Sequence, residues 1–276
     1  MLAAVSSPLA GADLSPLQAA LLGALQGLTE FLPISSSAHL YVVPEMLGWR
    51  YQGLAFDVAL HWGTLLALVV AFWRDWLDLA RGALRPGGAG AEARGILLRL
   101  AVASVPAAVA GLLLEDAATR YLRAPALQAG TLVLFGLLLW LADRRPGRPA
   151  AGDAGALPGW GTSLLVGAAQ ALALVPGVSR SGVTMTAGRA AGLDRVAAAR
   201  FSFLLATPIT FGAGLLELRH LAHDVPAATL AAGVVSAAVV GLLAIRGLLR
   251  WLARAGFAAF FAYRVALAAL ILAWLA

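Results

Sequence analysis

Apolar segments long enough to cross a membrane recur along this 276-residue chain. A membrane-spanning helix needs about 20 mostly apolar residues. The segments that meet this length are 54–73, 96–115, 125–142, 196–218, 226–245 and 256–275. Hydrophobic residues make up 61% of the chain and charged residues 12%, whereas soluble domains are about half apolar and about a quarter charged. The sequence therefore predicts an all-α integral membrane protein in which residues 1–276 form a single polytopic membrane domain.

Two further apolar stretches are each interrupted by a proline. The first begins at the helix-start signal S-P-L-Q of 15–18, and Pro33 ends this helix after about one span. The next piece, 36–47, is too short to cross a membrane. The stretch 160–192 repeats the pattern, with its break at Pro176. We expect both stretches to form re-entrant hairpins.

Arginines in the connections set the orientation, because cytoplasmic connections are enriched in basic residues. The connections assigned to the cytoplasm contain Arg74, Arg81, Arg85, Arg94, Arg99, Arg144, Arg145, Arg148, Arg246, Arg250 and Arg254. The connection 219–225, with two histidines and an aspartate, suits the outside. Counting crossings gives two halves of opposite orientation, about 14–142 and 158–276, each a re-entrant helical hairpin plus three transmembrane helices. This is an inverted-topology repeat, whose broken helices meet near the membrane midplane.

Charge and cysteine content exclude several functions. The net charge is +6 and every basic residue is an arginine, but the arginines lie between apolar segments, so we expect no nucleic-acid partner. The chain has no cysteine, which excludes disulfides and thiolate metal sites.

The first hairpin contains an unusual group of polar residues for a membrane segment. Gln26 and Glu30 are four residues apart and share one helix face, and Ser36 and His39 lie close together at the start of the next helix. Glu30 suits a hard divalent cation or a base, His39 a general acid or base, and Ser36 an activated nucleophile. The alternative is that Glu30 is a structural carboxylate satisfied by serine hydroxyls and helix N–H groups.

The second hairpin breaks at V-P-G-V-S-R-S-G, residues 175–182. Each helix that starts after a break presents free N–H groups and a positive dipole end. With nearby hydroxyls and the guanidinium of Arg180, two such helix starts predict an anion site, because arginine binds phosphate in a bidentate manner. The alternative is a helix cap with Arg180 extending to the membrane interface.

Other residues have less specific interpretations. Asp57 and His61 are four residues apart near the outer end of a span, and a structural pair is as good an explanation as a functional one. Glycines within the spans indicate close helix packing. These are Gly63, Gly111, Gly136, Gly212, Gly214 and Gly241.

Both hairpins resemble signatures of the undecaprenyl-diphosphate phosphatase family, also called bacitracin-resistance proteins. The matching stretches are G-L-T-E-F-L-P-I-S-S-S-A-H at 27–39 and P-G-V-S-R-S-G-V-T at 176–184, with further similar stretches at 56–64 and 201–208. The resemblance implies a bacterial plasma (inner) membrane enzyme that hydrolyses undecaprenyl diphosphate to undecaprenyl phosphate and phosphate. This activity recycles the lipid carrier for peptidoglycan synthesis and confers bacitracin resistance. The resemblance also implies a divalent cation, Mg²⁺ or Ca²⁺, and an active site that faces the periplasmic, outer side.

The resemblance also indicates which residues carry the activity. The catalytic residues that it implies are Glu30, Ser36, His39 and Arg180. The expected phosphate-binding residues are Ser35, Ser37, Ser179, Ser181, Gly182 and Thr184. We expect Glu30 and Gln26 to hold the cation. Many members of the family have a second glutamate where this chain has Gln26, which puts a two-carboxylate metal site in doubt.

Two questions stay open at this point. Either Ser36 attacks phosphorus with His39 as base, or Ser36 positions the phosphate while Glu30 or His39 activates water. A lipid-phosphate flippase is the alternative to an enzyme, because inverted repeats with broken helices are common in transporters. The expected partners are the lipid substrate and membrane lipid, and a homodimer is left open.

Overall fold

The computed structural model describes residues 14–49, 54–147, 157–217 and 225–276, and in these ranges the regular structure is helical. The helices of the first half are α1 (Pro16–Phe31), α2 (Ser36–Met46), α3 (Leu54–Ala71), α4 (Trp73–Ala83), α5 (Gly88–Tyr121) and α6 (Pro125–Asp143). Those of the second half are α7 (Trp160–Ala171), the 3₁₀ turn η1 (Leu172–Leu174), α8 (Arg180–Ala190), α9 (Arg195–Glu217), α10 (Ala227–Leu252) and α11 (Ala258–Leu275). The predicted all-α class is confirmed.

Both proline breaks occur where the sequence predicts them. Ser15 accepts a hydrogen bond from the backbone N–H of Gln18, and the Gln18 side chain accepts from the Ser15 backbone, which completes the capping box of α1. Pro33 lies in the turn between α1 and α2, and Pro176 lies between η1 and α8. The short helices that follow are too short to cross a membrane on their own.

In the described ranges, five helices are long and apolar enough to cross a membrane, or six if the bent pair α3–α4 counts as one span. Two predicted connections are wrong in detail. The region 74–95 contains α4 and the start of α5, and α10 continues to Leu252, so Arg246 and Arg250 are helical. Arginine has a high helix propensity, so a charged sequence next to a span does not by itself end a helix. The predicted outer connection at 219–225 lies mostly outside the described residues.

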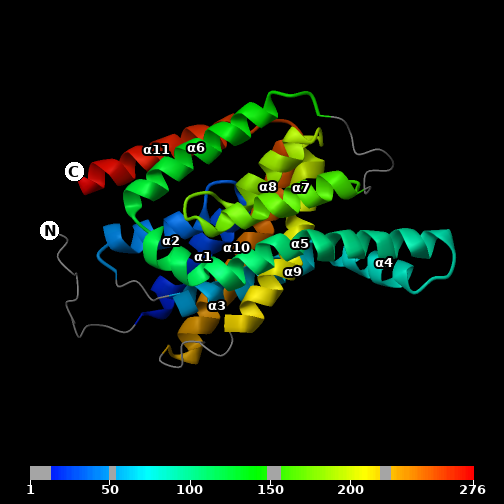
Figure 1. Cartoon of the computed structure of the whole chain (residues 1–276). Coiled ribbons are helices and arrows are strands. Elements are labelled where there is room, and N and C mark those ends of the chain that lie inside the picture. The colour runs from blue at the N-terminus through cyan, green and yellow to red at the C-terminus, as the bar shows by residue number, and fades with distance from the viewer. Residues whose placement is uncertain (1–13, 50–53, 148–156, 218–224) are drawn as a thin grey trace.

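Helices from distant parts of the sequence pack side by side (Figure 1). Helix α10 packs along α1 and α3, whereas α6 pairs with α11 and α5 with α7. Small residues allow the closest approach: a Cβ on Gly27 would lie 2.6 Å from the carbonyl oxygen of Ala237. The predicted glycine packing is confirmed at Gly63, Gly136, Gly214 and Gly241, but a Cβ on Gly111 or Gly212 would meet open space.

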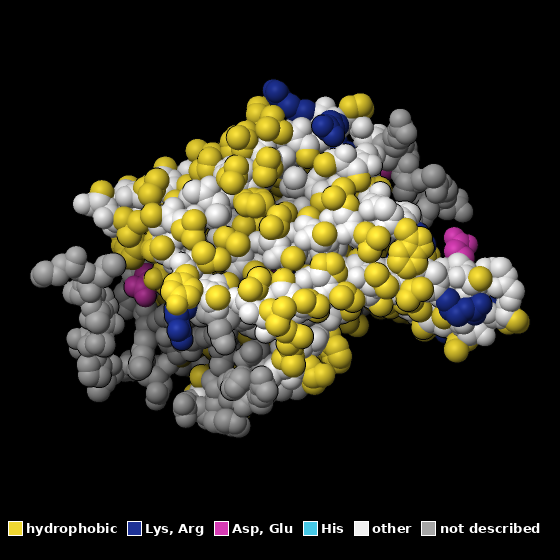
Figure 2. Space-filling view, in the orientation of Figure 1, with side chains coloured by type: hydrophobic (Ala, Val, Ile, Leu, Met, Phe, Trp, Pro, Cys, Tyr) yellow, Lys and Arg dark blue, Asp and Glu magenta, His cyan; other side chains and the backbone are white. Residues whose placement is uncertain are grey.

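The surface of the helical body is largely apolar. Figure 2 shows one face on which hydrophobic side chains cover the helices, with charged side chains near its margins. Large side chains that face outward include Leu112 (68% exposed) and Leu113 (75% exposed), both on α5. A protein surrounded by water would bury such a surface, so membrane lipid covers it.

Candidate active site

The two hairpin breaks contact each other. The Ser181 hydroxyl, at the start of α8, donates a hydrogen bond of 3.2 Å to the carbonyl oxygen of Leu32, at the end of α1. Arg180, beside it, forms an ion pair with Glu30 of α1. The free backbone groups of one break therefore meet the polar side chains of the other, which is how irregular backbone is tolerated at membrane depth.

The serine that precedes each second helix has an unusual backbone conformation. Ser35 has φ 74° and Ser179 has φ 72°, and they are the non-glycine residues with positive φ in the described chain. Each hydroxyl lies 3.2 Å from the hydroxyl of the serine two residues later, Ser37 or Ser181. Backbone strain of this kind is concentrated at functional sites.

Glu30 is the centre of the polar cluster. Its Oε2 accepts a hydrogen bond of 2.6 Å from the Ser36 hydroxyl and one of 3.1 Å from the Gln26 amide nitrogen. Its Oε1 accepts from Arg180. The His61 Nε2 lies 3.7 Å from Glu30 Oε2. The carboxylate is thus shared between a hydroxyl that can act as a nucleophile and a cation that can bind phosphate.

Arg180 is held on its other side by α9. Its guanidinium donates to the Thr210 hydroxyl at 2.6 Å and to the carbonyl oxygen of Ala206 at 3.2 Å. The side chain is directed to Glu30 and α9, which argues against the alternative of a cap residue that extends to the membrane interface.

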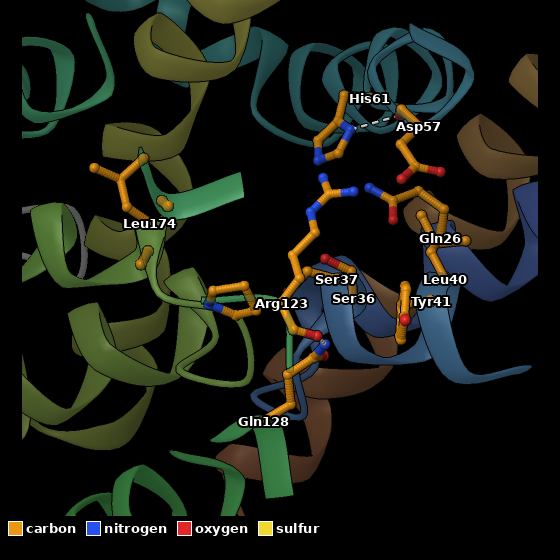
Figure 3. A pocket seen from close by; sticks show the side chains of 13 residues that line it. Gln26, Ser36, Ser37, Leu40, Tyr41, Asp57, His61, Arg123, Gln128 and Leu174 are labelled. Carbon is orange, nitrogen blue, oxygen red and sulfur yellow. Dashed lines mark hydrogen bonds between the residues drawn. The ribbon is translucent and has the colours of Figure 1, made fainter. Parts of the chain in front are cut away.

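Two adjoining cavities surround this cluster. One, of about 280 Å³, is lined by Glu30, Arg180 and four of the serines, together with apolar residues of α3, α5 and α9. The other, of about 210 Å³, shares Ser36, Ser37 and His61 with the first. Figure 3 shows this second cavity, with the Arg123 guanidinium pointing into it beside Gln26, Asp57 and His61.

Most of the predicted site residues line one of these cavities. They are Gln26, Glu30, Ser35, Ser36, Ser37, Ser179 and Arg180. Ser181, Gly182 and Thr184 are absent from both linings and hold α8 in place instead: the Gly182 N–H donates to Ser179, and the Thr184 hydroxyl lies 2.7 Å from that of Ser202.

His39 lies away from both cavities. Its Nδ1 is 2.7 Å from the carbonyl oxygen of Ser35, and its Nε2 is 2.7 Å from the Tyr263 hydroxyl. Because a carbonyl only accepts, Nδ1 carries the hydrogen and Nε2 accepts from Tyr263. The sequence predicts that His39 lies close to Ser36. In the structure, the His39 ring is hydrogen-bonded to the backbone carbonyl of Ser35, the residue before Ser36.

Several residues of the site were missed by sequence reasoning. Arg264 of α11 is fully buried and donates at 2.6 Å to the carbonyl oxygen of Val178, in the turn before Arg180. A lone arginine within the segment 256–275 is a signal, because ionisable residues inside spans are functional by default. Arg123 and Tyr263 had no comparable signal, because Arg123 lies in a connection between spans, where charged residues are expected, and Tyr263 is uncharged.

The donor set suits a hard cation only in part. No group of three His, Cys, Asp or Glu residues in the described parts of the chain is arranged to hold a metal ion. The Gln26 Oε1, however, is buried and has no hydrogen-bond partner in the described parts of the chain, and Gln26 lines the same cavity as Asp57. Mg²⁺ is typically held by one or two carboxylates together with substrate phosphates, so Gln26 Oε1 and Asp57, with Glu30 in the adjoining cavity, supply part of such a ligand set.

Fold and site define a class: a polytopic helical membrane protein with a buried cluster of polar and charged side chains between two broken helices. The sequence comparisons identify the family. The bacitracin resistance protein BacA family matches residues 19–270, and the chain belongs to this family.

Relatives named undecaprenyl-diphosphatase match nearly the whole chain. The protein of Moorella thermoacetica is 50% identical over 263 residues, covering 94% of this chain and 98% of the relative. That of Pelotomaculum thermopropionicum is 49% identical over 258 residues, covering 93% and 96%. That of Geobacter sulfurreducens is 47% identical over 266 residues, covering 94% and 98%.

Proposed function

We propose that this protein hydrolyses undecaprenyl diphosphate to undecaprenyl phosphate and phosphate. The observation that carries the proposal is the position of Glu30, whose two oxygens contact the hydroxyl of Ser36 and the guanidinium of Arg180. The shared name of the relatives gives the substrate and favours an enzyme over a flippase. This activity recycles the lipid carrier of cell-wall synthesis and thereby confers bacitracin resistance.

Arg180 and the hydroxyls of the breaks bind the diphosphate in this proposal. Oxygens of the terminal phosphate replace Glu30 at the guanidinium and accept from Ser35, Ser37 and Ser179, which line the same cavity. The start of α2 adds backbone N–H groups, because Ser35 makes no side-chain cap bond there. Hydrogen-bond donors that are fixed in place before the reaction thus stabilise the negative charge that develops in the transition state. Such stabilisation is usually the largest contribution to the rate enhancement.

Ser36 is the nucleophile that the geometry favours. Its Oγ attacks the terminal phosphorus, its proton passes to Glu30 Oε2, and the bond to the bridging oxygen breaks, so that undecaprenyl phosphate leaves with the electron pair. Water then attacks phosphorus and the bond to the Ser36 oxygen breaks; Glu30 returns its proton to that oxygen, and the protons of the water leave with the released phosphate. The 2.6 Å contact between Ser36 and Glu30 supports this route over one with His39 as base.

His39 acts as a positioning residue in this proposal. Its Nδ1–H holds the carbonyl oxygen of Ser35, and Tyr263 fixes the ring from the other side. The ring therefore maintains the strained conformation of Ser35, which aims Ser36 at the cavity.

A divalent cation, Mg²⁺ or Ca²⁺, would be held by Glu30, Gln26 Oε1 and Asp57 together with substrate oxygens. Bound there, it would neutralise charge on the diphosphate. Gln26 contributes through its unpartnered amide oxygen, while its nitrogen orients Glu30.

We further propose a plasma-membrane protein whose site opens to the outer side. The cavity in Figure 3 is lined by Arg123, in the connection between α5 and α6, and by Gln128, near the start of α6. The ion pairs of Asp143 with Arg189 and Arg195 lie next to Arg144 and Arg145, in a connection assigned to the cytoplasm. The two matched breaks, each with a positive-φ serine, support the inverted-topology repeat.

Phosphate release by the purified protein in detergent tests the proposal. We expect release from undecaprenyl diphosphate but none from undecaprenyl phosphate, and we expect a chelator to suppress it. Absence of release, combined with transbilayer movement of the lipid in proteoliposomes, would replace the enzyme by a flippase.

A further inference from the structure

Gln170, near the end of α7, is a buried amide with neither polar atom bonded. The residue is 2% exposed, and both its Oε1 and its Nε2 lack a hydrogen-bond partner among the described residues. Buried polar groups are nearly always hydrogen-bonded, so an unbonded one points to a missing ligand or to a functional role. Gln170 lines the 280 Å³ cavity that also contains Glu30 and Arg180.

The corresponding residue of the first hairpin explains why this amide is unpaired. Gln26 precedes the positive-φ Ser35 by the same number of residues as Gln170 precedes Ser179. In the first hairpin, Glu30 follows one helical turn after the glutamine and accepts from its amide. In the second hairpin, Leu174 occupies that position. The amide of Gln170 therefore has no carboxylate partner one turn later and can bind a ligand in the cavity.

The polar neighbours in this cavity indicate which ligand suits the amide. Arg180, Ser179 and Thr210 line it and are donors or cationic. The carboxylate of Glu30 also lines it, but both of its oxygens already accept hydrogen bonds from neighbouring side chains. A further cation would meet the guanidinium there, whereas an oxyanion would be attracted to it and would accept from the amide nitrogen. Part of the cavity wall is apolar, with Val58 and Ile209 among its residues. Such a wall excludes water and strengthens a hydrogen bond to a charged group.

We propose that Gln170 is a substrate-binding residue whose Nε2 donates a hydrogen bond to an oxygen of the diphosphate held by Arg180. The assignment rests on the proposed phosphatase function and adds to it a contact from α7, a helix to which no part of the site is otherwise attributed. The strained serines and Arg180 bind the phosphate from the helix starts, and Gln170 binds it from the helix that precedes the second break.

The test replaces the amide by an apolar side chain of similar length. Gln170→Met removes both polar atoms without opening a cavity, so we expect a thermal midpoint in detergent equal to or above that of the wild type. We expect kcat/KM for undecaprenyl diphosphate to fall about tenfold or more, since a hydrogen bond to a charged group is lost. Gln18→Met, in the capping box of α1 and outside the cavity, should leave KM unchanged.

Gln170→Glu distinguishes an anion ligand from a cation ligand. A carboxylate at this position repels the diphosphate, so this variant should be less active than Gln170→Met. The divalent-cation concentration at half-maximal activity should be equal to or higher than that of the wild type. A Gln170→Met variant within threefold of the wild-type kcat/KM would overturn the assignment, and so would a Gln170→Glu variant that is saturated by less cation.

A second measurement covers the case in which Gln170→Met unfolds. Binding of substrate to the Ser36→Ala protein is then compared with binding to the Ser36→Ala, Gln170→Glu protein, and equal affinities would overturn the assignment. If the wild-type protein itself releases no phosphate, the proposed function fails. If the wild type is active and the Gln170 variants are unaffected, only the assignment of Gln170 fails.

Discussion

The hydroxyl of Ser36 donates a 2.6 Å hydrogen bond to the carboxylate of Glu30 across the break between α1 and α2. The two residues are six apart in the sequence, and no regular helix would bring them together. The reversal of the chain after Pro33 does so, and Arg180 then joins the same carboxylate from the other half of the protein. The proposed nucleophile, Ser36, and the phosphate-binding cation, Arg180, thus both contact the carboxylate of Glu30, which serves as the base.

Loss of the Ser36 hydroxyl should stop turnover. For Ser36→Ala we expect the rate of phosphate release to fall by about a thousandfold or more, as is typical when a nucleophile is removed. Acid quenching of the wild type during turnover should trap phosphate on Ser36. Phosphate release by Ser36→Ala near the wild-type rate would contradict the covalent route and would assign the attack to water.

Arg180 should be needed for the transition state rather than for folding. Arg180→Ala should lower kcat by about a hundredfold or more, because it removes a charged donor from the reacting phosphate. Arg74→Ala, at an exposed arginine of α4, is the matched control and should leave kcat unchanged. Activity of Arg180→Ala within tenfold of the wild type would show that the guanidinium is not required.

Gln26→Glu should change the response to divalent cations. A second carboxylate beside Glu30 provides a stronger ligand for Mg²⁺ or Ca²⁺ than an amide oxygen. We expect a lower cation concentration at half-maximal activity, measured by titration after chelator treatment. Gln128→Glu, at another buried glutamine of the same cavity, controls for negative charge alone. An unchanged titration for Gln26→Glu would exclude position 26 from the cation site.

His39 and Tyr263 should affect the amount of activity but not its pH profile. Tyr263→Phe keeps the ring that stacks on His39 and removes one hydrogen bond, so we expect a loss of about tenfold or less. His39→Phe removes the donor to Ser35 and should lower kcat more strongly. A limb of the kcat–pH profile that disappears in the His39 variant would instead identify His39 as a general acid or base.

Gly177 should be required for the second hairpin to form. Its φ is 88°, and a Cβ there would lie 2.1 Å from the Thr131 hydroxyl oxygen, which accounts for glycine after Pro176. Gly192→Ala is the matched control, because its φ is 94° but no atom lies within 4 Å. We expect Gly192→Ala to cost about 1–2 kcal/mol of unfolding free energy. Gly177→Ala should lower the thermal midpoint in detergent much further, and equal shifts would contradict this explanation.

Much of the site was predictable because membrane segments permit few polar groups. Glu30, Ser36 and Arg180 stood out as polar residues at proline breaks within apolar sequence, and the structure brings all of them to one cavity. Helix ends beside charged connections were less predictable. Helix α4 and the last turns of α10 form in sequence that looked like connection, because arginine-rich segments remain helical where they can lie at a membrane interface.

The sequence by itself determined the class of the protein, the position of both breaks and the residues that occupy them, since hydrophobicity and proline act locally along the chain. Only the tertiary structure decided the partners of these residues. It placed Arg264 of the last span against the turn at Val178, turned His39 to Tyr263 and left the amide of Gln170 without a partner among the described residues. These relationships depend on how the helices pack, which no local pattern specifies.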